Sequence, residues 1–578
     1  MATLLLLAAL LQSPAAIGQV VAQFALTDIH YLKRSLDDLG AHDAYVLLFV
    51  TRSCPLAQRY LPRVIEMERD YRGRDVQFAL INAGAGDSIL EVAQQMVESG
   101  IAFPVLKDFD GDGARALGVT HTPEVAVLDR RHVLRYRGRI DAQYRLTGVN
   151  PQPGRADLRA ALEDVLAGRD VAVPTTPVDG CLITLAADAP AAASVTYAEH
   201  VAPILYLHCV ECHRPGGQAP FSLCAYDEVA SQAQMIAEVV REQRMPPWYA
   251  APGQGEFLNH RGTSAEERRL IRAWVAAKTP PGDLSKAPPP PPPRTSPWLI
   301  GEPDLVIKQL TMTTLPADGY VPYQYVVLPY VFLHDTWVSA AQILPENTRA
   351  LHHANLGYFK LGEKFKTENF ITGLVPGGDP MQLDEGVAVL IPAGSVLGLQ
   401  AHYVTTGTPG QDRLSVGLRF PHVPVQKRLY HYQIHDARFR IPPGAPAHEV
   451  HAAQTFAHDA TGVGMFSHMH VRGRDMTFRA TYPDGSSEVL LMVPNYNFDW
   501  QSSYRWAPAS KHFPAGTRVD VVAHFDNSPF NPYNPDPGAQ VRFGLQTDQE
   551  MMYGFLFYTQ DDECLDLHVD PKSGQAGT

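Results

Sequence analysis

The first third of the chain alternates strand-like and helix-like patterns. The apolar runs at residues 44–50 and 76–82 are each followed by a run of helical periodicity, at residues 55–71 and 87–100. Short apolar runs of this kind are typical of buried strands, and their alternation with helices is the rhythm of βαβ units. The pattern therefore predicts an α/β domain over residues 20–180 with a mostly parallel sheet.

Two different patterns follow this domain. Residues 190–283 are predicted to form short helices around one pair of cysteines, ending in an amphipathic helix at residues 264–277. A run of prolines then begins at Pro288, and such a run favours the extended polyproline II conformation. We therefore expect a small all-α domain, followed by a semi-rigid linker over residues 284–296.

The rest of the chain predicts short strands separated by glycine and proline turns, which is typical of all-β sandwiches. This region also repeats itself. IPAGSVLGLQAHY from Ile391 aligns with FPAGTRVDVVAHF from Phe513, and SVGLRF then aligns approximately with VRFGLQ. The repeat predicts two tandem sandwiches, at residues 297–425 and 426–570, and it places His402 opposite His524.

Charge and hydropathy exclude two classes of function. Lys and Arg number 48 against 61 Asp and Glu, a net charge of −13, whereas a nucleic-acid-binding surface is basic. Residues 1–19 hold an apolar run and then small residues, which is typical of a signal peptide, with a buried N-terminal helix as the alternative. No later run is long enough to span a bilayer. We expect an exported protein, periplasmic or extracellular, with no nucleic-acid partner and no membrane span in the mature chain.

Cys209, Cys212 and His213 form a CxxCH motif, the pattern of covalent c-type haem attachment. A zinc site is the alternative, but it would need further ligands of similar spacing, and the sequence has no second CxxC. Met245 is the candidate sixth ligand, because a thioether raises the haem potential towards electron transfer; a gap-filling core methionine is the alternative reading. The segment resembles a class I type cytochrome c domain.

Cys54 lies between a predicted strand and a predicted helix, where the helix dipole lowers the pKa of a thiol. The stretch FPVLKDFDGDGARALGVTHTPEVAVLD resembles the thioredoxin-like redoxin family, with Pro123 at the family's cis-proline position. Ala57 stands where a CxxC motif has its second cysteine, which excludes dithiol exchange at that motif. Three roles stay open for Cys54: a reactive thiol, a disulfide with Cys181, or a place in a domain kept for docking.

The candidate copper ligands are imidazoles and one thioether. They fall into a first set, His352, His353 and His402, and a second set, His468, His470 and Met551. On a strand, side chains two residues apart share a face, so one ion could bind both His468 and His470. Adjacent His352 and His353 would converge only at a bulge or a strand end. Imidazole with thioether suits copper, although ligand type alone leaves zinc open.

This ordered set resembles the copper type II, ascorbate-dependent monooxygenases, the family of peptidylglycine alpha-hydroxylating and dopamine beta-monooxygenases, over residues 300–562. The resemblance implies that the first set holds an electron-transfer copper and the second an oxygen-activating copper, facing each other across a solvent-filled cleft. The internal repeat offers His524 as the alternative to Met551. Phe466, Tyr553 and Phe555 stand where the peptide hydroxylases bind a substrate carboxylate, so a C-terminal glycine peptide is not expected as substrate.

The sequence thus predicts a multidomain protein: an α/β thioredoxin-like domain, an all-α cytochrome c domain and two tandem all-β jelly-roll sandwiches. The implied activity is a copper-dependent monooxygenase that hydroxylates a C–H bond of a small organic substrate with O2, using two copper ions and one covalent haem c. An external donor, ascorbate or a redox protein, would supply electrons, and the tethered haem would relay them. Two alternatives stay open: a non-catalytic copper and haem binding protein, and a thiol peroxidase centred on Cys54. The sequence does not determine how Cys54, Cys181, Cys224 and Cys564 pair.

Overall fold

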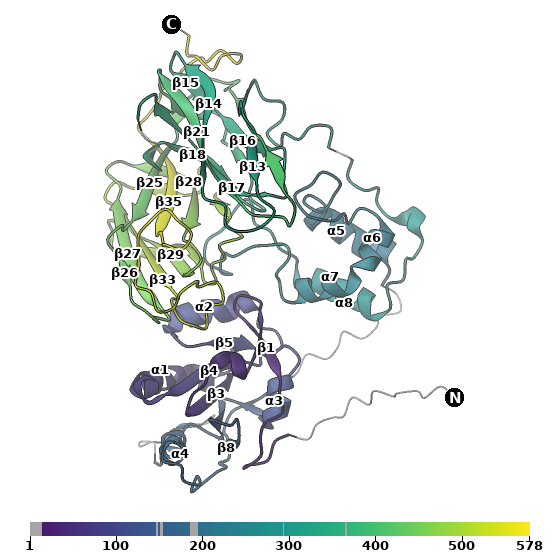
Figure 1. The fold of residues 1–578 in the computed structure, drawn as a ribbon, viewed down its shortest axis with the longest axis vertical. Helices are drawn as coiled ribbons and strands as arrows, with labels where there is room; N and C mark the ends of the chain where they lie inside the picture. The colour runs from purple at the N-terminus through teal and green to yellow at the C-terminus, as the bar shows by residue number, and fades with distance from the viewer. Residues whose placement is uncertain are drawn as a thin grey trace. The chain divides into compact units, whose positions relative to one another are not determined.

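The computed structural model describes residues 14–145, 148–150, 154–184, 195–292, 294–363 and 367–577. The chain folds into two compact units (Figure 1). The first runs to Asp188 and includes Ser528–Pro532, and the second comprises Ala189–Asn527 and Tyr533–Thr578. Among the described residues, no helix has the length and apolar character needed to cross a membrane.

A seven-stranded sheet forms the first unit, in the order β2-β1-β5-β4-β3-β7-β8. The bounds are β1 Ala25–Asp28, β2 Lys33–Ser35, β3 Ala44–Val50, β4 Val76–Asn82, β5 Val105–Lys107, β7 Glu124–Asp129 and β8 Leu134–Gly138. Only β3, β4 and β5 run parallel, and the remaining neighbours are antiparallel. The expectation of a mostly parallel sheet is therefore wrong. A tight turn joins β7 to β8, and such a turn can connect only antiparallel strands.

Helices cover both faces of this sheet. Their bounds are α1 Pro55–Tyr71, α2 Ile89–Ser99, α3 Asp112–Leu117 and α4 Asp157–Leu166. Along β3, Val46 and Leu48 join a core with α1, α2 and α4, whereas Leu47 and Phe49 join a second core with α3. This alternation follows from the two-residue period of a strand. Strands β3 and β4 and helix α1 match the predicted ranges residue for residue.

The described N-terminus packs into this unit. Residues 1–13, most of the predicted signal peptide, lie outside the described residues. Ala15 is buried, and its N–H donates to the carbonyl of Ala116 at 2.9 Å. The N–H of Gly18 donates to the carbonyl of Leu134 at 2.8 Å. The structured part of the domain therefore begins before the predicted boundary at residue 20.

The second unit begins with a helical segment that matches the predicted short helices. After a π-helical turn at Tyr197–Val201, its helices are α5 Ala202–His208, α6 Tyr226–Ser231, α7 Ala233–Arg241 and α8 Ala265–Ala276. Ser264 and Glu267 form a capping box that starts α8. Trp274 on α8 is fully buried at the centre of the segment's core, and its indole N–H donates to the carbonyl of Pro280 at 3.1 Å.

The rest of the second unit is rich in β-sheet, and its topology repeats. The sheets β14-β21-β17-β18 and β27-β33-β29-β30 have equivalent strand orders, as do β12-β23-β16-β19 and β25-β35-β28-β31. The first-half bounds are β12 Leu305–Lys308, β14 Gln324–Phe332, β16 Ala340–Pro345, β17 Leu351–Lys360, β18 Phe370–Leu374, β19 Met381–Gln382, β21 Ser395–Tyr403 and β23 Leu414–Arg419. The second-half bounds are β25 Tyr430–His435, β27 His448–Thr455, β28 Ala460–His468, β29 Gly473–Thr481, β30 Ser487–Val493, β31 Ser503–Arg505, β33 Arg518–Phe525 and β35 Tyr553–Gln560.

The topology confirms one half of the aligned repeat and corrects the other. Strand β21, which carries His402, lies between β14 and β17. Strand β33, which carries His524, lies in the equivalent position between β27 and β29. The counterpart of β23 is β35, however, and not the aligned VRFGLQ, where only the short β34 (Val541–Arg542) forms and pairs with β26 (Arg440–Ile441). The alignment failed there because a long loop separates β33 from β35.

The proline run does not end a compact unit, because the residues on both of its sides belong to the second unit. The guanidinium of Arg214 donates to the carbonyls of Pro291 and Pro292. Arg261 forms a salt bridge with Asp379 at 2.5 Å. The helical segment is thus held against the β-rich region by contacts of its own, in addition to the linker.

Candidate metal centres and the redox thiol

The first histidine set lies on two adjacent strands. His353 on β17 is the cross-strand partner of His402 on β21, and the register shifts between Leu351 and His353. This bulge, one of the two arrangements that the sequence left open, lets His352 approach its neighbour. One ligand atom from each of the three histidines lies within 4.8 Å of the others. The three side chains can therefore hold one ion together.

The contacts of the ring nitrogens indicate which of them face the position where the three histidines converge. The Nδ1 atoms of His352 and His353 lie 3.1 Å apart. Their Nε2 atoms contact other groups, Asp499 Oδ1 at 3.1 Å and the hydroxyl of Tyr323 at 3.3 Å. Nδ1 of His402 is buried and has no hydrogen-bond partner in the described part of the chain. A buried polar atom without a partner is costly, and a metal ion would satisfy it.

Burial keeps the imidazoles of His353 and His402 in the neutral form that binds metals. It lowers the pKa of His353 well below the usual value and lowers the pKa of His402 to about 4, with the neighbouring histidines contributing to both shifts. Metal ligation requires the neutral imidazole. No proton therefore has to leave either ring at neutral pH, and the donor set fits copper.

The second set lies where β28 ends. His468 is the last residue of this strand, and His470 lies beyond it, so the expected single strand face is wrong. The two rings still converge, with centroids 5.2 Å apart. Nδ1 of His468 contacts Oε1 of Gln501 at 2.7 Å, and Nδ1 of His470 contacts the carbonyl of Gln549 at 3.1 Å. Both bonds orient the rings and leave the Nε2 atoms to bind an ion.

Met551 lies in a segment whose neighbouring residues pair with this region. His468 is the cross-strand partner of Tyr553 on β35, and the N–H of His470 donates to Glu550 Oε2 at 2.8 Å. Met551 lies between these two anchored positions and is 7% exposed. Burial also lowers the pKa of His470 to about 3. Two neutral imidazoles and one thioether suit a copper ion that cycles through Cu(I).

His524 lies elsewhere, and the topology explains why. Its Nδ1 contacts Asp475 Oδ1 at 2.7 Å within the sheet of β27, β33 and β29. The first set lies on the equivalent sheet of the first half, but His468 ends β28, His470 follows that strand and Met551 precedes β35, and both strands belong to the partner sheet. The two candidate sets are therefore not related by the repeat, and sequence symmetry points to a different sheet.

One loop, between β30 and β31, contacts both sets. The Phe498 ring lies 5.9 Å from the ring of His353 and 5.9 Å from that of His470. The same loop supplies Asp499 to His352 and Gln501 to His468. An aromatic ring thus contacts both sets where the resemblance implied only a solvent-filled cleft. Sequence analysis missed these three residues, because no motif marks the loop.

We expect Gln501→Leu to weaken copper binding at the second set by about 10- to 100-fold, since an orienting hydrogen bond to a ligand histidine is lost. Copper titration followed by equilibrium dialysis measures the change. Gln454→Leu, the same substitution at an exposed position on β27, is the matched control. It should leave the copper affinities of the first and second sets unchanged. Equal affinities in Gln501→Leu and wild type would show that Gln501 does not position His468.

The helical segment brings Cys209, Cys212 and His213, the predicted haem-binding residues, into one turn. Cys209 directly follows α5, and the N–H of His213 donates to the carbonyl of Cys209 at 2.9 Å. Nδ1 of His213 contacts the carbonyl of Phe221 at 3.2 Å, which leaves Nε2 to face an iron. Burial raises the pKa of Cys209 to about 12. These residues fit a covalent haem, and Met245 lies in the loop that follows α7.

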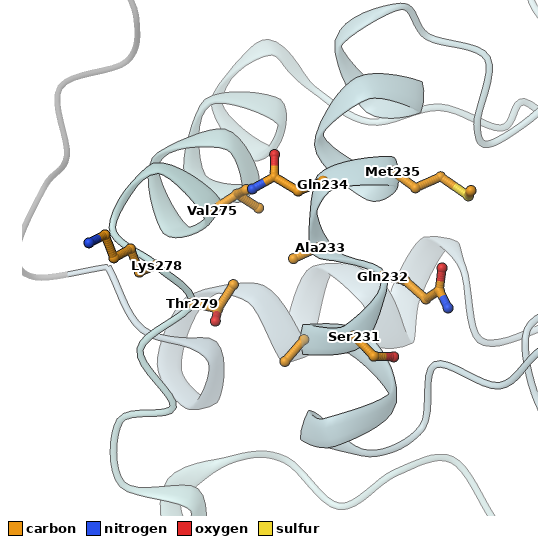
Figure 2. Close-up of a pocket in the computed structure, with 9 residues that line it drawn as sticks. Ser231, Gln232, Ala233, Gln234, Met235, Val275, Lys278 and Thr279 are labelled. Carbon is orange, nitrogen blue, oxygen red and sulfur yellow. The ribbon is translucent and has the colours of Figure 1, made fainter. Parts of the chain in front are cut away.

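A separate pocket of about 480 Å³ lies between the α6–α7 junction and the end of α8 (Figure 2). Its lining includes Gln234, Met235, Val275 and Lys278. It contains none of the four predicted haem-binding residues, so we assign it no ligand.

Cys54 caps the N-terminus of α1 and is completely buried. Its thiol donates to the carbonyl of Thr122 at 3.0 Å, and the Thr122–Pro123 peptide bond is cis, as the sequence resemblance implied. Burial raises the pKa of Cys54, but hydrogen bonds from Ala57, Thr122 and Cys181 outweigh it, so the net pKa is below the usual value. Cys54 is thus an enclosed thiol whose thiolate form is stabilised.

Comparison with known proteins assigns this first unit. The sequence model of the AhpC/TSA family matches residues 17–137. Residues 17–137 form a thioredoxin-like redoxin domain. This assignment agrees with the mixed sheet, the flanking helices and the cis-proline beside Cys54.

Solved structures are similar to part of the chain. A hypothetical protein from Sinorhizobium meliloti is 27% identical with a TM-score of 0.27, and the match covers 30% of this chain and 97% of that one. A conserved protein from Geobacillus kaustophilus is 29% identical with a TM-score of 0.28, covering 30% and 93%. A putative thiol:disulfide interchange protein, DsbE, from Chlorobium tepidum is 19% identical with a TM-score of 0.22, covering 26% and 99%. Among curated proteins, none matches the chain significantly.

Proposed function

We propose that the β-rich region is a two-copper monooxygenase built on two tandem jelly-roll sandwiches. The observation that carries the proposal is the first histidine set, in which three imidazoles converge within 4.8 Å. A buried His402 nitrogen without a hydrogen-bond partner among the described residues supports it. When bound, one copper would pass electrons and the other would activate O2 to hydroxylate a substrate C–H bond.

The protein's own residues prepare this site. Gln501 and the Gln549 carbonyl orient the second-set imidazoles, and burial holds them neutral. Beside Met551, the rings of Phe466, Tyr553 and Phe555 form a buried aromatic cluster. Such a wall excludes water and favours an apolar part of a small organic substrate over a charged group.

We further propose that the helical segment is a cytochrome c domain that relays electrons to the first set. Cys209 and Cys212 would attach the haem, and His213 and Met245 would be its axial ligands, so the iron would have no free position for O2. The segment belongs to the same compact unit as the β-rich region, which favours transfer within one chain. Ascorbate or a redox protein would be the external donor, and export remains part of the proposal.

Metal analysis tests the proposal directly. We expect about two coppers and one covalent haem per chain, because two three-ligand sets and one CxxCH motif are present. Inductively coupled plasma mass spectrometry and a pyridine haemochrome assay give the two numbers. A single tightly bound copper, or zinc retained in both sets after copper loading, would contradict the two-copper assignment.

The alternatives differ in what they consume. A non-catalytic copper and haem binding protein would bind both metals without substrate-dependent oxygen uptake. A thiol peroxidase would consume peroxide without copper, but a peroxidatic thiol must be accessible, and Cys54 is completely buried. The oxygen electrode and a peroxide assay therefore separate the three functions.

A further inference from the structure

Two cysteines that lie far apart in the sequence meet in the redoxin domain. The short strand β11 (Cys181–Leu182) pairs antiparallel with β6 (His121–Thr122), and Cys181 is the direct partner of Thr122. The Cys54 thiol lies 3.0 Å from the carbonyl of the same Thr122. Hydrogen bonds from the Cys181 thiol and backbone reach the Cys54 sulfur. Cys181 thus supplies a second thiol beside Cys54, where Ala57 stands in place of the second cysteine of a CxxC motif.

The chain is built to hold Cys181 there. The N–H of Ile183 donates to the carbonyl of Thr120 at 2.9 Å, which anchors β11 beyond the cysteine. On the other side, a Cβ added to Gly180 would come within 2.3 Å of the Thr122 carbonyl oxygen, so only glycine allows this close approach. Upstream of Gly180 in the chain, the carbonyl of Pro174 accepts a hydrogen bond from the N–H of Arg137 at 3.0 Å. Several independent contacts therefore fix the segment beside Cys54.

The two thiols have different environments. Cys54 is completely buried, while Cys181 is partly exposed. Hydrogen bonds give Cys54 a lowered pKa, whereas burial and the neighbouring Cys54 raise the pKa of Cys181. In thiol–disulfide exchange, the sulfur with the lower pKa is the better leaving group, and the accessible sulfur is attacked.

We propose that Cys54 and Cys181 form a dithiol/disulfide couple that exchanges electrons with external thiols, with Cys181 as the attacked sulfur and Cys54 as the leaving group. An external thiolate attacks the Cys181 sulfur of the disulfide, forms a mixed disulfide with Cys181 and releases the Cys54 thiolate. A second external thiolate then attacks the external sulfur and releases Cys181. The disulfide gains two electrons and two protons, and two thiols are oxidised to one disulfide. The reverse sequence oxidises the couple.

Glutathione redox buffers test the couple in the full-length, haem-loaded protein. We expect one two-electron transition, in which a peptide linked through Cys54 and Cys181 appears in tryptic maps as oxidised glutathione increases. Cys564→Ser, which removes an exposed cysteine of the β-rich region, is the control and should leave the transition unchanged. Absence of the linked peptide at every glutathione ratio would overturn the proposal.

Single variants test the two roles. With oxidised glutathione, Cys54→Ser should form an adduct at Cys181, and Cys181→Ser should form one at Cys54 about tenfold more slowly, because the remaining thiol is buried. Gly180→Ala retains both thiols but displaces β11, so it should reduce formation of the linked peptide without affecting the haem spectrum. Equally fast adduct formation at the two cysteines, or an unchanged couple in Gly180→Ala, would overturn the assigned roles.

Discussion

Met551→Ile should decrease substrate-dependent oxygen uptake by at least about 100-fold while the copper at the first set and the haem spectrum persist. Isoleucine keeps the size and burial of the side chain but removes the only thioether of the second set. The first set lies on β17 and β21, and Met551 belongs to neither strand. Oxygen consumption, copper content and the haem spectrum of one preparation give all three readouts.

His524→Ala is the control for this variant. His524 is the alternative ligand suggested by the repeat, but it pairs with Asp475 on a different sheet. We expect both coppers to stay bound and turnover to change little. Loss of the second copper in His524→Ala, with normal copper in Met551→Ile, would replace Met551 by His524 in the ligand set.

His402→Ala should lower the copper content from about two to about one per chain and slow the reoxidation of reduced haem by O2. The variant removes one of three converging imidazoles and leaves the second set and the haem-binding motif intact. Stopped-flow absorbance with copper-loaded protein and a true substrate measures the reoxidation. The rate should not depend on protein concentration, because the helical segment and the β-rich region form one compact unit.

His422→Ala removes an exposed histidine of the same β-rich half, whose ring lies 3.7 Å from Asp304, and serves as the control. It should leave copper content and reoxidation unchanged. The haem spectrum of His402→Ala should also match wild type, since no haem ligand is altered. Equal reoxidation rates in copper-loaded and copper-free wild type would show that the haem does not serve the copper site.

Several features of this protein follow from the sequence alone, because they depend on local patterns. Strand β3 and helix α1 have the predicted bounds. The hydrophobic periodicity that predicts each of them lies within the segment itself. The adjacency of His352 and His353 predicted that they converge only at a bulge or a strand end, and the structure has a bulge. The two candidate ligand sets were likewise predicted from residue types and their order along the chain.

Only the tertiary structure decided which distant residues meet. The loop carrying Phe498, Asp499 and Gln501 has no motif, and its contacts with both ligand sets arise from packing. His524 lies on a different sheet from β28 and β35, because the repeat preserves strand order whereas the second set is positioned by the partner sheet. Cys181 is 127 residues from Cys54, and only the β6–β11 ladder brings the two thiols together. Sequence patterns encode local periodicity, while strand pairing between remote segments is a property of the folded chain.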